Sequence, residues 1–153
     1  MADKNNENGI IEAVEPTENA TASSVTSNGF KPKKYITFDP LIPANRVRMF
    51  NARNSATSLK DLGDTPIDIV DVMTQIGVRA RSGNPCQNTY IFAADGQVYF
   101  TQSNGLGKTI NEVVDMISGD FKANTTNGYV RAQIKEIPVS GDRSYKQFQL
   151  LEA

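Results

Sequence analysis

The sequence predicts a mostly β domain with a single helix, preceded by a polar N-terminal arm. Three observations favour this fold class. Residues 90–100 place Asp95-Gly96 between two runs of β-branched and aromatic residues, which is a strong short-range signal for a β-hairpin. Segments with alternating polar and apolar residues lie on both sides of this hairpin. Helical spacing of apolar residues is found at residues 106–117.

Residues 1–30 form the predicted arm, and residues 31–153 form the folded domain. The arm is rich in Asn, Glu, Ser and Thr, so it cannot bury enough surface to offset its ordering entropy, and we expect it to be disordered alone. It holds one Lys against five acidic residues, whereas the rest of the chain holds 15 Lys and Arg against 12 acidic residues. A mildly basic domain thus follows an acidic arm. Ile10, Ile11 and Val14 could dock on the domain or on a neighbouring subunit; a solvated leader is the alternative.

The composition argues against an enzyme and against a metal site. The 153 residues include no His, the usual general base and commonest metal ligand, and a single Cys, Cys86. Gly107-Lys108-Thr109 matches the end of a P-loop, but that motif requires a glycine where Gln102 stands. No apolar run approaches the roughly 18 residues that a membrane span needs. We therefore expect a cytoplasmic, non-enzymatic protein with no cofactor and no membrane contact.

Three extended segments are predicted before the hairpin. The first covers residues 34–38 and ends where Pro40 and Pro43 interrupt it. The second covers residues 45–52, with Val47 and Met49 on one face and Arg46, Arg48 and Phe50 on the other. The third covers residues 67–81, with Val70, Val72, Thr74, Ile76 and Val78 inward. Its outward residues are Asp71, Met73, Gln75, Arg79 and Arg81.

A two-residue turn at Asp95-Gly96 sets the register of the predicted hairpin. It places Phe92 opposite Tyr99 and Ile91 opposite Phe100, with neighbouring residues on alternate faces. The core face then consists of Ile91, Ala93, Val98 and Phe100. The other face consists of Tyr90, Phe92, Gln97, Tyr99 and Thr101. Three aromatic rings on this second face suggest a surface that stacks bases. The alternative is that another strand, the N-terminal segment or a second subunit covers them.

One helix and two strands are predicted after the hairpin. Thr109 and Glu112 fit a capping box at the helix start, and Gly119 suits the helix end. The buried stripe of the helix consists of Leu106, Ile110, Val113, Val114 and Ile117. The final strands cover residues 129–137 and 144–151, with Val130, Ala132 and Ile134 inward. Three strand regions, one helix and two strands is the order of a five-stranded Greek-key barrel of the OB type, in which the helix would plug the open end.

Barrels of the OB type bind oligonucleotides or oligosaccharides on the face of their second and third strands. Here that face would combine rings that stack on bases with cations that track phosphates, as sequence-tolerant binding of a single strand requires. Duplex DNA hides its base faces, so single-stranded DNA is the expected partner. Carbohydrate binding also uses aromatic residues but rarely needs four arginines. The candidate residues are Tyr99, Tyr90, Phe92, Arg46, Arg48, Phe50, Arg79 and Arg81.

Three short motifs carry a resemblance to a known family. They are Phe50-Asn51-Ala52, Ser58-Leu59-Lys60-Asp61-Leu62, and Ile91-Phe92-Ala93-Ala94-Asp95-Gly96 with Tyr99. Over residues 46–151, the chain resembles the single-stranded DNA-binding proteins of small protein-primed tailed phages. The resemblance implies a protein that coats the displaced strand during viral replication, protects it from nucleases and prevents non-productive polymerase binding. It also implies that Tyr99 contacts DNA.

The chain departs from that family in two respects. Family members have tyrosines in the strand before the hairpin, whereas this chain has none between residues 67 and 88, so Arg79 or Arg81 would have to cover base faces instead. The first 45 residues have no counterpart in shorter members, which suggests self-association through the arm. The main alternative is a protein–protein interaction module, such as a phage assembly or regulatory protein, whose aromatic face is a subunit interface. RNA binding is chemically close to DNA binding.

Overall fold

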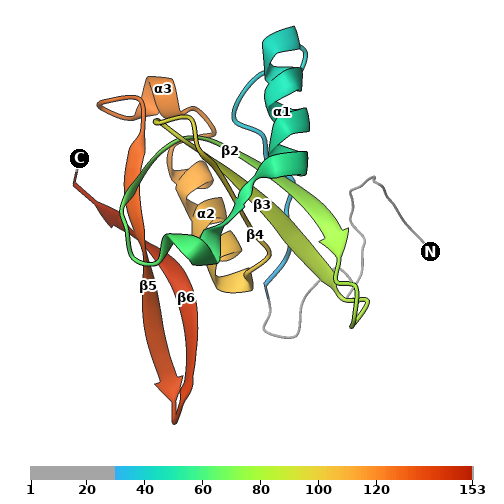
Figure 1. Cartoon of the computed structure of the whole chain (residues 1–153). Helices are drawn as coiled ribbons and strands as arrows, with labels where there is room; N and C mark the ends of the chain where they lie inside the picture. Colours follow the sequence, from blue (N-terminus) through green and yellow to red (C-terminus); the bar gives the residue numbers. More distant parts are fainter. Residues whose placement is uncertain (1–29, 153) are drawn as a thin grey trace.

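The computed structural model describes residues 30–152, which fold into one six-stranded sheet with helices on both of its faces (Figure 1). The strands follow the order β1-β4-β3-β2-β5-β6 across the sheet. They are β1 (Thr57–Ser58), β2 (Ile67–Val78), β3 (Pro85–Ala93), β4 (Val98–Thr101), β5 (Val130–Ser140) and β6 (Arg143–Leu151). The helices are α1 (Pro43–Ser55), the 3-10 helix η3 (Leu59–Leu62), α2 (Asn104–Met116) and α3 (Phe121–Asn124).

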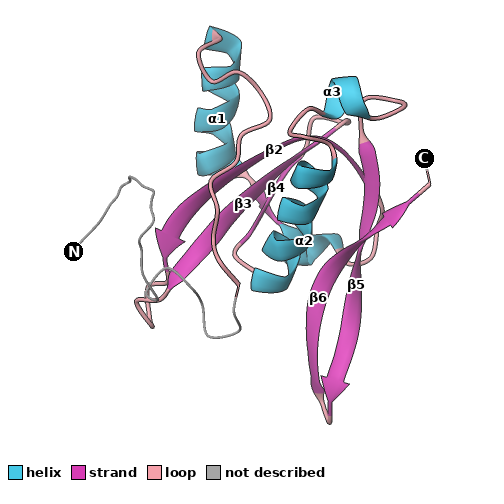
Figure 2. Ribbon diagram, turned by 180° about the vertical axis from the view of Figure 1, so that it is seen from behind, coloured by secondary structure: helices cyan, strands magenta, loops and turns pink. Residues whose placement is uncertain are grey.

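The predicted β-rich fold class is confirmed, but the five-stranded barrel with a single helix is not, because residues 30–152 contain six strands and the helices α1, η3, α2 and α3. β2 pairs along most of its length with β3, while its first residues, 67–69, pair with β5. The sheet therefore bends, and α2 lies in the bend between β2–β4 and β5–β6 (Figure 2). Within residues 30–152 no ladder joins β4 to β6, so the sheet is a curled half-barrel rather than a closed one.

The main core lies between α2 and the concave face of the sheet. The predicted stripe of Leu106, Ile110, Val113, Val114 and Ile117 is buried there, against residues of β2, β3, β5 and β6. A buried amide pair adds specificity: Gln87 on β3 and Asn111 on α2 exchange two hydrogen bonds of 2.9 Å. Buried polar groups are stable only when paired, so this exchange specifies how α2 sits on β3.

The predicted capping box is wrong, because the helix begins five residues earlier than Thr109. Ser103 is the cap, and its hydroxyl accepts a hydrogen bond from the backbone N–H of Leu106. Thr109 lies inside α2, where its hydroxyl contacts the Gly105 carbonyl and accepts a 3.0 Å hydrogen bond from the Phe148 backbone N–H. Its side chain therefore joins α2 to β6 instead of capping the helix.

The predicted strand at residues 45–52 is also wrong: these residues belong to α1. Pro43 occupies the first turn of this helix, where its missing N–H and restricted φ are compatible with helical structure. From the sequence pattern alone, this proline predicts only the end of the preceding extended segment. Alternation over a few residues is weak grounds for a strand when the flanking residue also suits a helix start.

The hairpin is present, but its register differs from the prediction by one residue. Phe92 pairs with Val98, Ile91 with Tyr99 and Tyr90 with Phe100. The loop is longer than two residues, because the Ala93 N–H donates to the Gln97 carbonyl and Gly96 takes a φ of 92°. A slip of one residue reverses every side chain of the second strand. Tyr99 consequently packs against the main core, while Val98 and Phe100 lie on the opposite face.

A β-bulge reverses the alternation within β2. The register shifts between Ile69 and Asp71, so that Ile69 and Val72 both face the main core. Val70, predicted inward, therefore lies on the α1 side. Val72 faces inward and Met73 faces outward as predicted, although Met73 is buried in the cluster on the α1 side. The predicted inward positions Ile76 and Val78 are exposed at the far end of the strand.

Candidate nucleic-acid interface

The face of the sheet under α1 carries a second, smaller apolar cluster that includes the two predicted aromatic residues of β3. Tyr90 and Phe92 lie opposite the main core, as predicted, but they are only 7% and 3% exposed. Helix α1 and the segment around Ile36 and Phe38 cover them, and Phe38 contacts Phe92 edge-on at 5.4 Å. The expectation that these rings form an open stacking surface is thus wrong, since the chain covers them itself.

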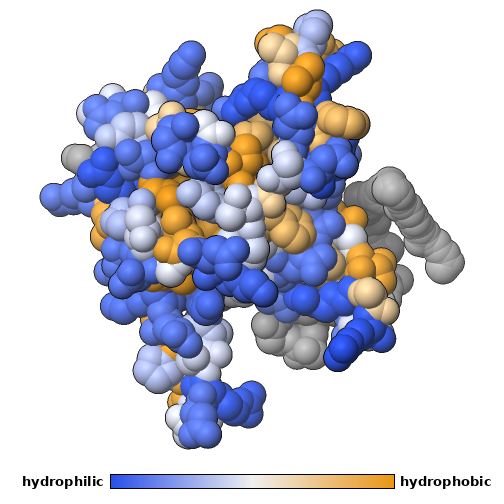
Figure 3. Space-filling model, in the orientation of Figure 1, coloured by the Kyte–Doolittle hydropathy of each residue, from blue (hydrophilic) through white to orange (hydrophobic). Residues whose placement is uncertain are grey.

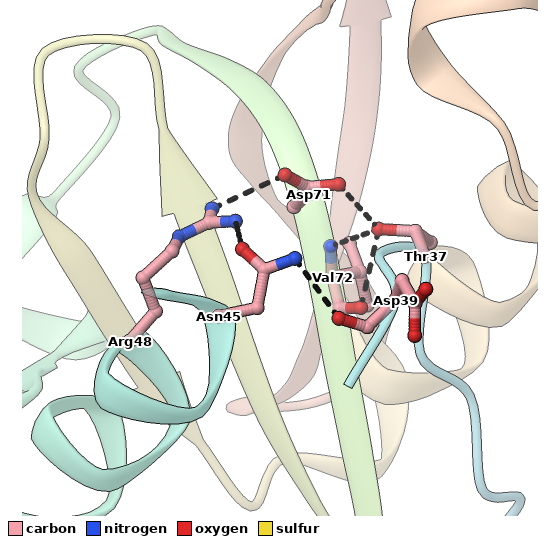
Figure 4. Close-up of polar contacts among 6 residues, drawn as sticks. All are labelled: Thr37, Asp39, Asn45, Arg48, Asp71 and Val72. Atoms are coloured by element: carbon pink, nitrogen blue, oxygen red, sulfur yellow. Dashed lines mark hydrogen bonds and ion pairs between the residues drawn. The ribbon is translucent and has the colours of Figure 1, made fainter. Parts of the chain in front are cut away.

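A polar network holds α1 in place above these rings (Figure 4). Arg48 of α1 donates to the Asp71 carboxylate at 3.1 Å, and Thr37 donates to the other oxygen of that carboxylate at 2.8 Å. Arg48 also donates to the Asn45 side chain, whose amide donates to the Asp39 carbonyl. The Arg48 guanidinium lies 4.7 Å from the Phe92 ring centre. Arg48 is therefore a paired cation that attaches the helix.

Two hollows lie where α1 meets the β3–β4 hairpin, and we call them together the helix–hairpin cleft. The first has a volume of about 130 Å³ and is lined by Ala52, Arg53, Asn54, Ala56, Tyr90 and Phe100. The second has a volume of about 210 Å³ and is lined by Arg48, Asn51, Phe92, Ala93, Gly96, Gln97 and Val98. The helix contributes arginine and amide groups to this cleft, whereas the hairpin contributes aromatic and apolar side chains.

Arg53 and Phe100 are the cationic and aromatic members of the cleft that are absent from the predicted site. Burial raises the pKa of Tyr90, and the positive charge of Arg53 opposes that rise. The Arg53 guanidinium is therefore close enough to the Tyr90 hydroxyl to influence its pKa. Phe100 is half-buried and contacts Tyr90, with ring centres 5.1 Å apart. Helical spacing of Arg46, Phe50 and Arg53 could have indicated the role of Arg53, had residues 45–52 been assigned to a helix.

Arg46 and Phe50 lie on the outer side of α1, and both are exposed. Phe50 leaves 62% of its surface accessible, and Val47 beside it leaves 59%. Apolar surface is visible over α1 in the space-filling view (Figure 3). These residues have the predicted accessibility, but they lie on a helix next to the cleft rather than on a strand.

Arg79 and Arg81 follow the C-terminal end of β2, which ends at Val78. Arg79 donates to the Gln102 carbonyl at 2.8 Å and to the Asn104 side chain at 3.2 Å, so it connects β2 to the start of α2. Its charge also opposes the rise that burial causes in the pKa of Cys86. Arg81 is exposed in the loop between β2 and β3. The structure therefore makes Arg79 a structural cation and leaves Arg81 accessible.

Tyr99 is separated from the other predicted rings by the register of the hairpin. It is half-buried beside the main core, and its backbone pairs with Thr57 of β1. The predicted outward position of Tyr99 is thus wrong, while its role in DNA contact stays a prediction. Ile10, Ile11 and Val14, the predicted self-association residues, lie outside the described residues.

Residues 30–152 contain neither a metal-binding cluster nor a membrane-spanning helix. Among residues 30–152, no three His, Cys, Asp or Glu side chains are grouped so that they could hold a metal ion. No helix in the same range has the length and apolar character needed to cross a bilayer.

Comparison with protein-family models matches residues 31–145 to the family described as phage single-stranded DNA-binding protein. No curated protein and no solved structure matches the chain.

Proposed function

Since the chain belongs to the phage single-stranded DNA-binding protein family, we propose that its copies coat displaced strands during protein-primed viral replication in the host cytoplasm. Family membership supports single-stranded DNA as the ligand and a non-catalytic role. The proposal adds the replication step, the absence of sequence preference and the surface used. The observation that carries it is the helix–hairpin cleft, where arginine and aromatic side chains meet.

The fold supports this location for the site. The strand order β4-β3-β2-β5-β6, with α2 between β4 and β5, suits an open barrel of the OB type, whose ligand face is formed by the second and third strands. Those strands correspond to β3 and β4 here. The cleft lies on their face opposite the main core, so a ligand could bind without disturbing the buried residues.

The residues in and around the cleft have distinct physical roles in the proposal, while Tyr99, half-buried beside the main core, remains a candidate contact on the family resemblance alone. Phe50 and Phe100 stack on bases, and each stacked base contributes about 1–3 kcal/mol. Arg46, Arg53 and Arg81 neutralise phosphates, which makes the affinity depend on salt concentration. Tyr90 and Phe92 form the floor beneath Phe100 and the helix. Arg48 and Arg79 act mainly by positioning α1 and the start of α2, because each guanidinium donates to two part-buried protein groups. Arg46 is exposed and, within residues 30–152, donates only to the Pro40 carbonyl, at 3.3 Å.

A titration with oligo-dT, followed by tyrosine fluorescence at two salt concentrations, tests the proposal. The paired substitution Phe50→Ala with Arg53→Ala should weaken binding by about five-fold or more, since one stacking contact alone is worth about 1 kcal/mol. Lys122→Ala, an exposed cation on α3, is the matched control and should bind like the wild type. Wild-type affinity in the paired variant would move the site away from the cleft. Absence of single-strand binding by the wild type would overturn the function itself.

Self-association forms a separate part of the proposal. We infer that the acidic arm, residues 1–30, links copies through Ile10, Ile11 and Val14, while the replication polymerase is a functional rather than a direct partner. Deletion of residues 1–30 should lower the mass in solution by sedimentation. An unchanged mass would contradict self-association through the arm.

A protein partner on α1 is the second candidate function, and one observation favours it. Leu41 and Ile42 at the helix start are 72% and 48% exposed, and they extend the apolar surface of Val47 and Phe50. If this surface binds protein, Leu41→Ser should abolish the contact while leaving the affinity for oligo-dT unchanged.

A further inference from the structure

The β5–β6 hairpin projects beyond the rest of the sheet, and its outer half is exposed (Figures 1 and 2). Tyr145 lies on this outer half, opposite Ile137 in the ladder, and keeps 47% of its surface accessible. By strand alternation, one face of the ribbon carries Tyr145 with two cations and no acidic residue. The residues on this face are Lys135, Ile137, Arg143, Tyr145 and Gln147, and Ser140 pairs with Arg143 beyond a register shift after Pro138.

The acidic side chains of the hairpin do not compensate this face. Glu136 pairs across the ladder with Lys146, on the other face, and accepts a 2.8 Å hydrogen bond from Ser144. Asp142 belongs to the turn at the tip. An exposed ring flanked by unpaired positive charge is complementary to a base and its phosphates.

The first turn of α2 supports the Tyr145 ring from behind. A methyl group at Gly105 would overlap the backbone carbonyl of Lys146 and would lie 3.4 Å from Cδ2 of Tyr145. The helix backbone therefore packs directly against β6 at this point. A tyrosine held in this way loses little conformational freedom when a base stacks on its open side.

The same turn of α2 is connected to the other end of the proposed DNA surface. Asn104, next to Gly105, accepts a hydrogen bond from Arg79. Gln102 precedes this turn, and its side chain donates to Asn88 of β3 at 2.8 Å. Hydrogen bonds of Asn104 and Gln102 thus connect the ends of β2 and β3 to the turn of α2 that contacts β6.

We propose that Tyr145, Lys135 and Arg143 form a second contact site for the same DNA strand, where it continues past the helix–hairpin cleft. This inference rests on the proposed function, because the cleft supplies the first contact. Tyr145 stacks on a base, and the two cations neutralise adjacent phosphates. The ligand is single-stranded DNA, because the ring needs an unpaired base face.

Titrations of the full chain with oligo-dT of increasing length test this site. Tyr145→Ala should bind the shortest oligomers like the wild type and long ones about five-fold more weakly, whereas Tyr145→Phe should restore long-strand binding. The substitutions Lys135→Ala and Arg143→Ala should each lower the slope of log affinity against log salt by about 0.7 on long strands. Circular dichroism checks that every variant is folded.

The outcomes separate this inference from the proposed function. If Tyr145→Ala and the two cation variants match the wild type at every length, while Phe50→Ala with Arg53→Ala binds weakly, the second site is overturned and the cleft remains. If the wild type fails to bind any oligo-dT, both proposals fall. A loss for Tyr145→Ala that is equal on short and long strands would also overturn the second site, because it would place the ring within the first one.

Discussion

Helices α1 and α2 have the same length, 13 residues each, and they cover opposite faces of the same strands, yet they are attached in different ways. Helix α2 buries six residues, including Leu106, Ile110, Val113 and Val114, whereas α1 buries only Ala52. Helix α1 is instead attached through Arg48 and its contacts with Asp71 and the Phe92 ring. Apolar burial therefore dominates on the α2 face, whereas the α1 face combines a smaller apolar cluster with polar contacts.

This difference indicates that α2 contributes mainly to stability, whereas α1 borders the proposed binding surface. A helix that buries many apolar side chains leaves no space for a ligand, because protein interiors are densely packed. A helix attached through a few polar contacts leaves the hollows of the helix–hairpin cleft beside it. Substitutions on α2 should accordingly affect folding, while substitutions on the outer side of α1 should affect binding.

The largest expected effect is a loss of stability when the α2 side is truncated. Ile110 is fully buried, so Ile110→Ala should lower the free energy of unfolding by about 2–5 kcal/mol. Phe50→Ala, the matched truncation on α1, should change it by less than about 0.5 kcal/mol, because Phe50 is exposed. Urea denaturation measures both values. Equal losses would contradict the contrast between the two helices.

The next effect concerns the close approach of α2 to β6. Gly105→Ala should lower the free energy of unfolding by about 1–3 kcal/mol, because the added methyl group overlaps the Lys146 carbonyl and the backbone must shift. Lys108→Ala, at an exposed position of the same helix, is the control. If Gly105→Ala proved as stable as this control, β6 would not depend on direct contact with the helix backbone.

A smaller effect is expected where α1 is attached. Asp71→Asn removes the charge that holds Arg48, and we expect a loss of about 1 kcal/mol, since both side chains are only partly buried. The loss should shrink at high salt. Limited proteolysis should then cut near α1 sooner than in the wild type. A cut pattern like that of the wild type would show that α1 is held by its apolar contacts alone.

The smallest effect should appear only at alkaline pH. The Tyr35 hydroxyl donates to Asp115 at 2.8 Å; burial first, and then this carboxylate, raise the pKa of Tyr35 to about 12. The protonated form is favoured by folding, so the contribution of Tyr35 is complete below pH 10 and is lost between pH 10 and 12. In Tyr35→Phe, this part of the pH dependence of unfolding should disappear. An identical alkaline profile in the variant would contradict the assignment.

Parts of the fold with long periodic patterns could be predicted from the sequence, whereas register could not. The apolar stripe of α2 and the inward residues of β5 were recognised correctly, because each pattern repeats over the whole element. The hairpin was recognised from Asp95-Gly96, but the face of Tyr99 depended on one residue of loop length. The bulge after Ile69 likewise moved Val70 to the α1 side without any signal in the composition.

The candidate site shows the same division. Alternation in a predicted strand places Arg46, Arg48 and Phe50 on one face, whereas on the helix Arg46 and Phe50 are exposed and Arg48 is paired with Asp71. The accessibility of Tyr90 and Phe92 also depends on this secondary structure, because once residues 43–55 form a helix, that helix covers both rings. Arg53 and Phe100 also line the cleft because of the tertiary structure. Arg53 does so because its segment is a helix, and Phe100 because the hairpin register is shifted by one residue.

The sequence by itself determined that this chain is a β-rich domain with rings and arginines suited to single-stranded DNA, and its motifs pointed to the phage family that residues 31–145 match. Composition and short motifs are local properties, so they can be read without a fold. Only the tertiary structure decided which rings are accessible and which arginines are already paired. Exposure and pairing are set by contacts between distant residues, such as Arg48 with Asp71 and Gly105 with Lys146, and such contacts exist only in the folded chain.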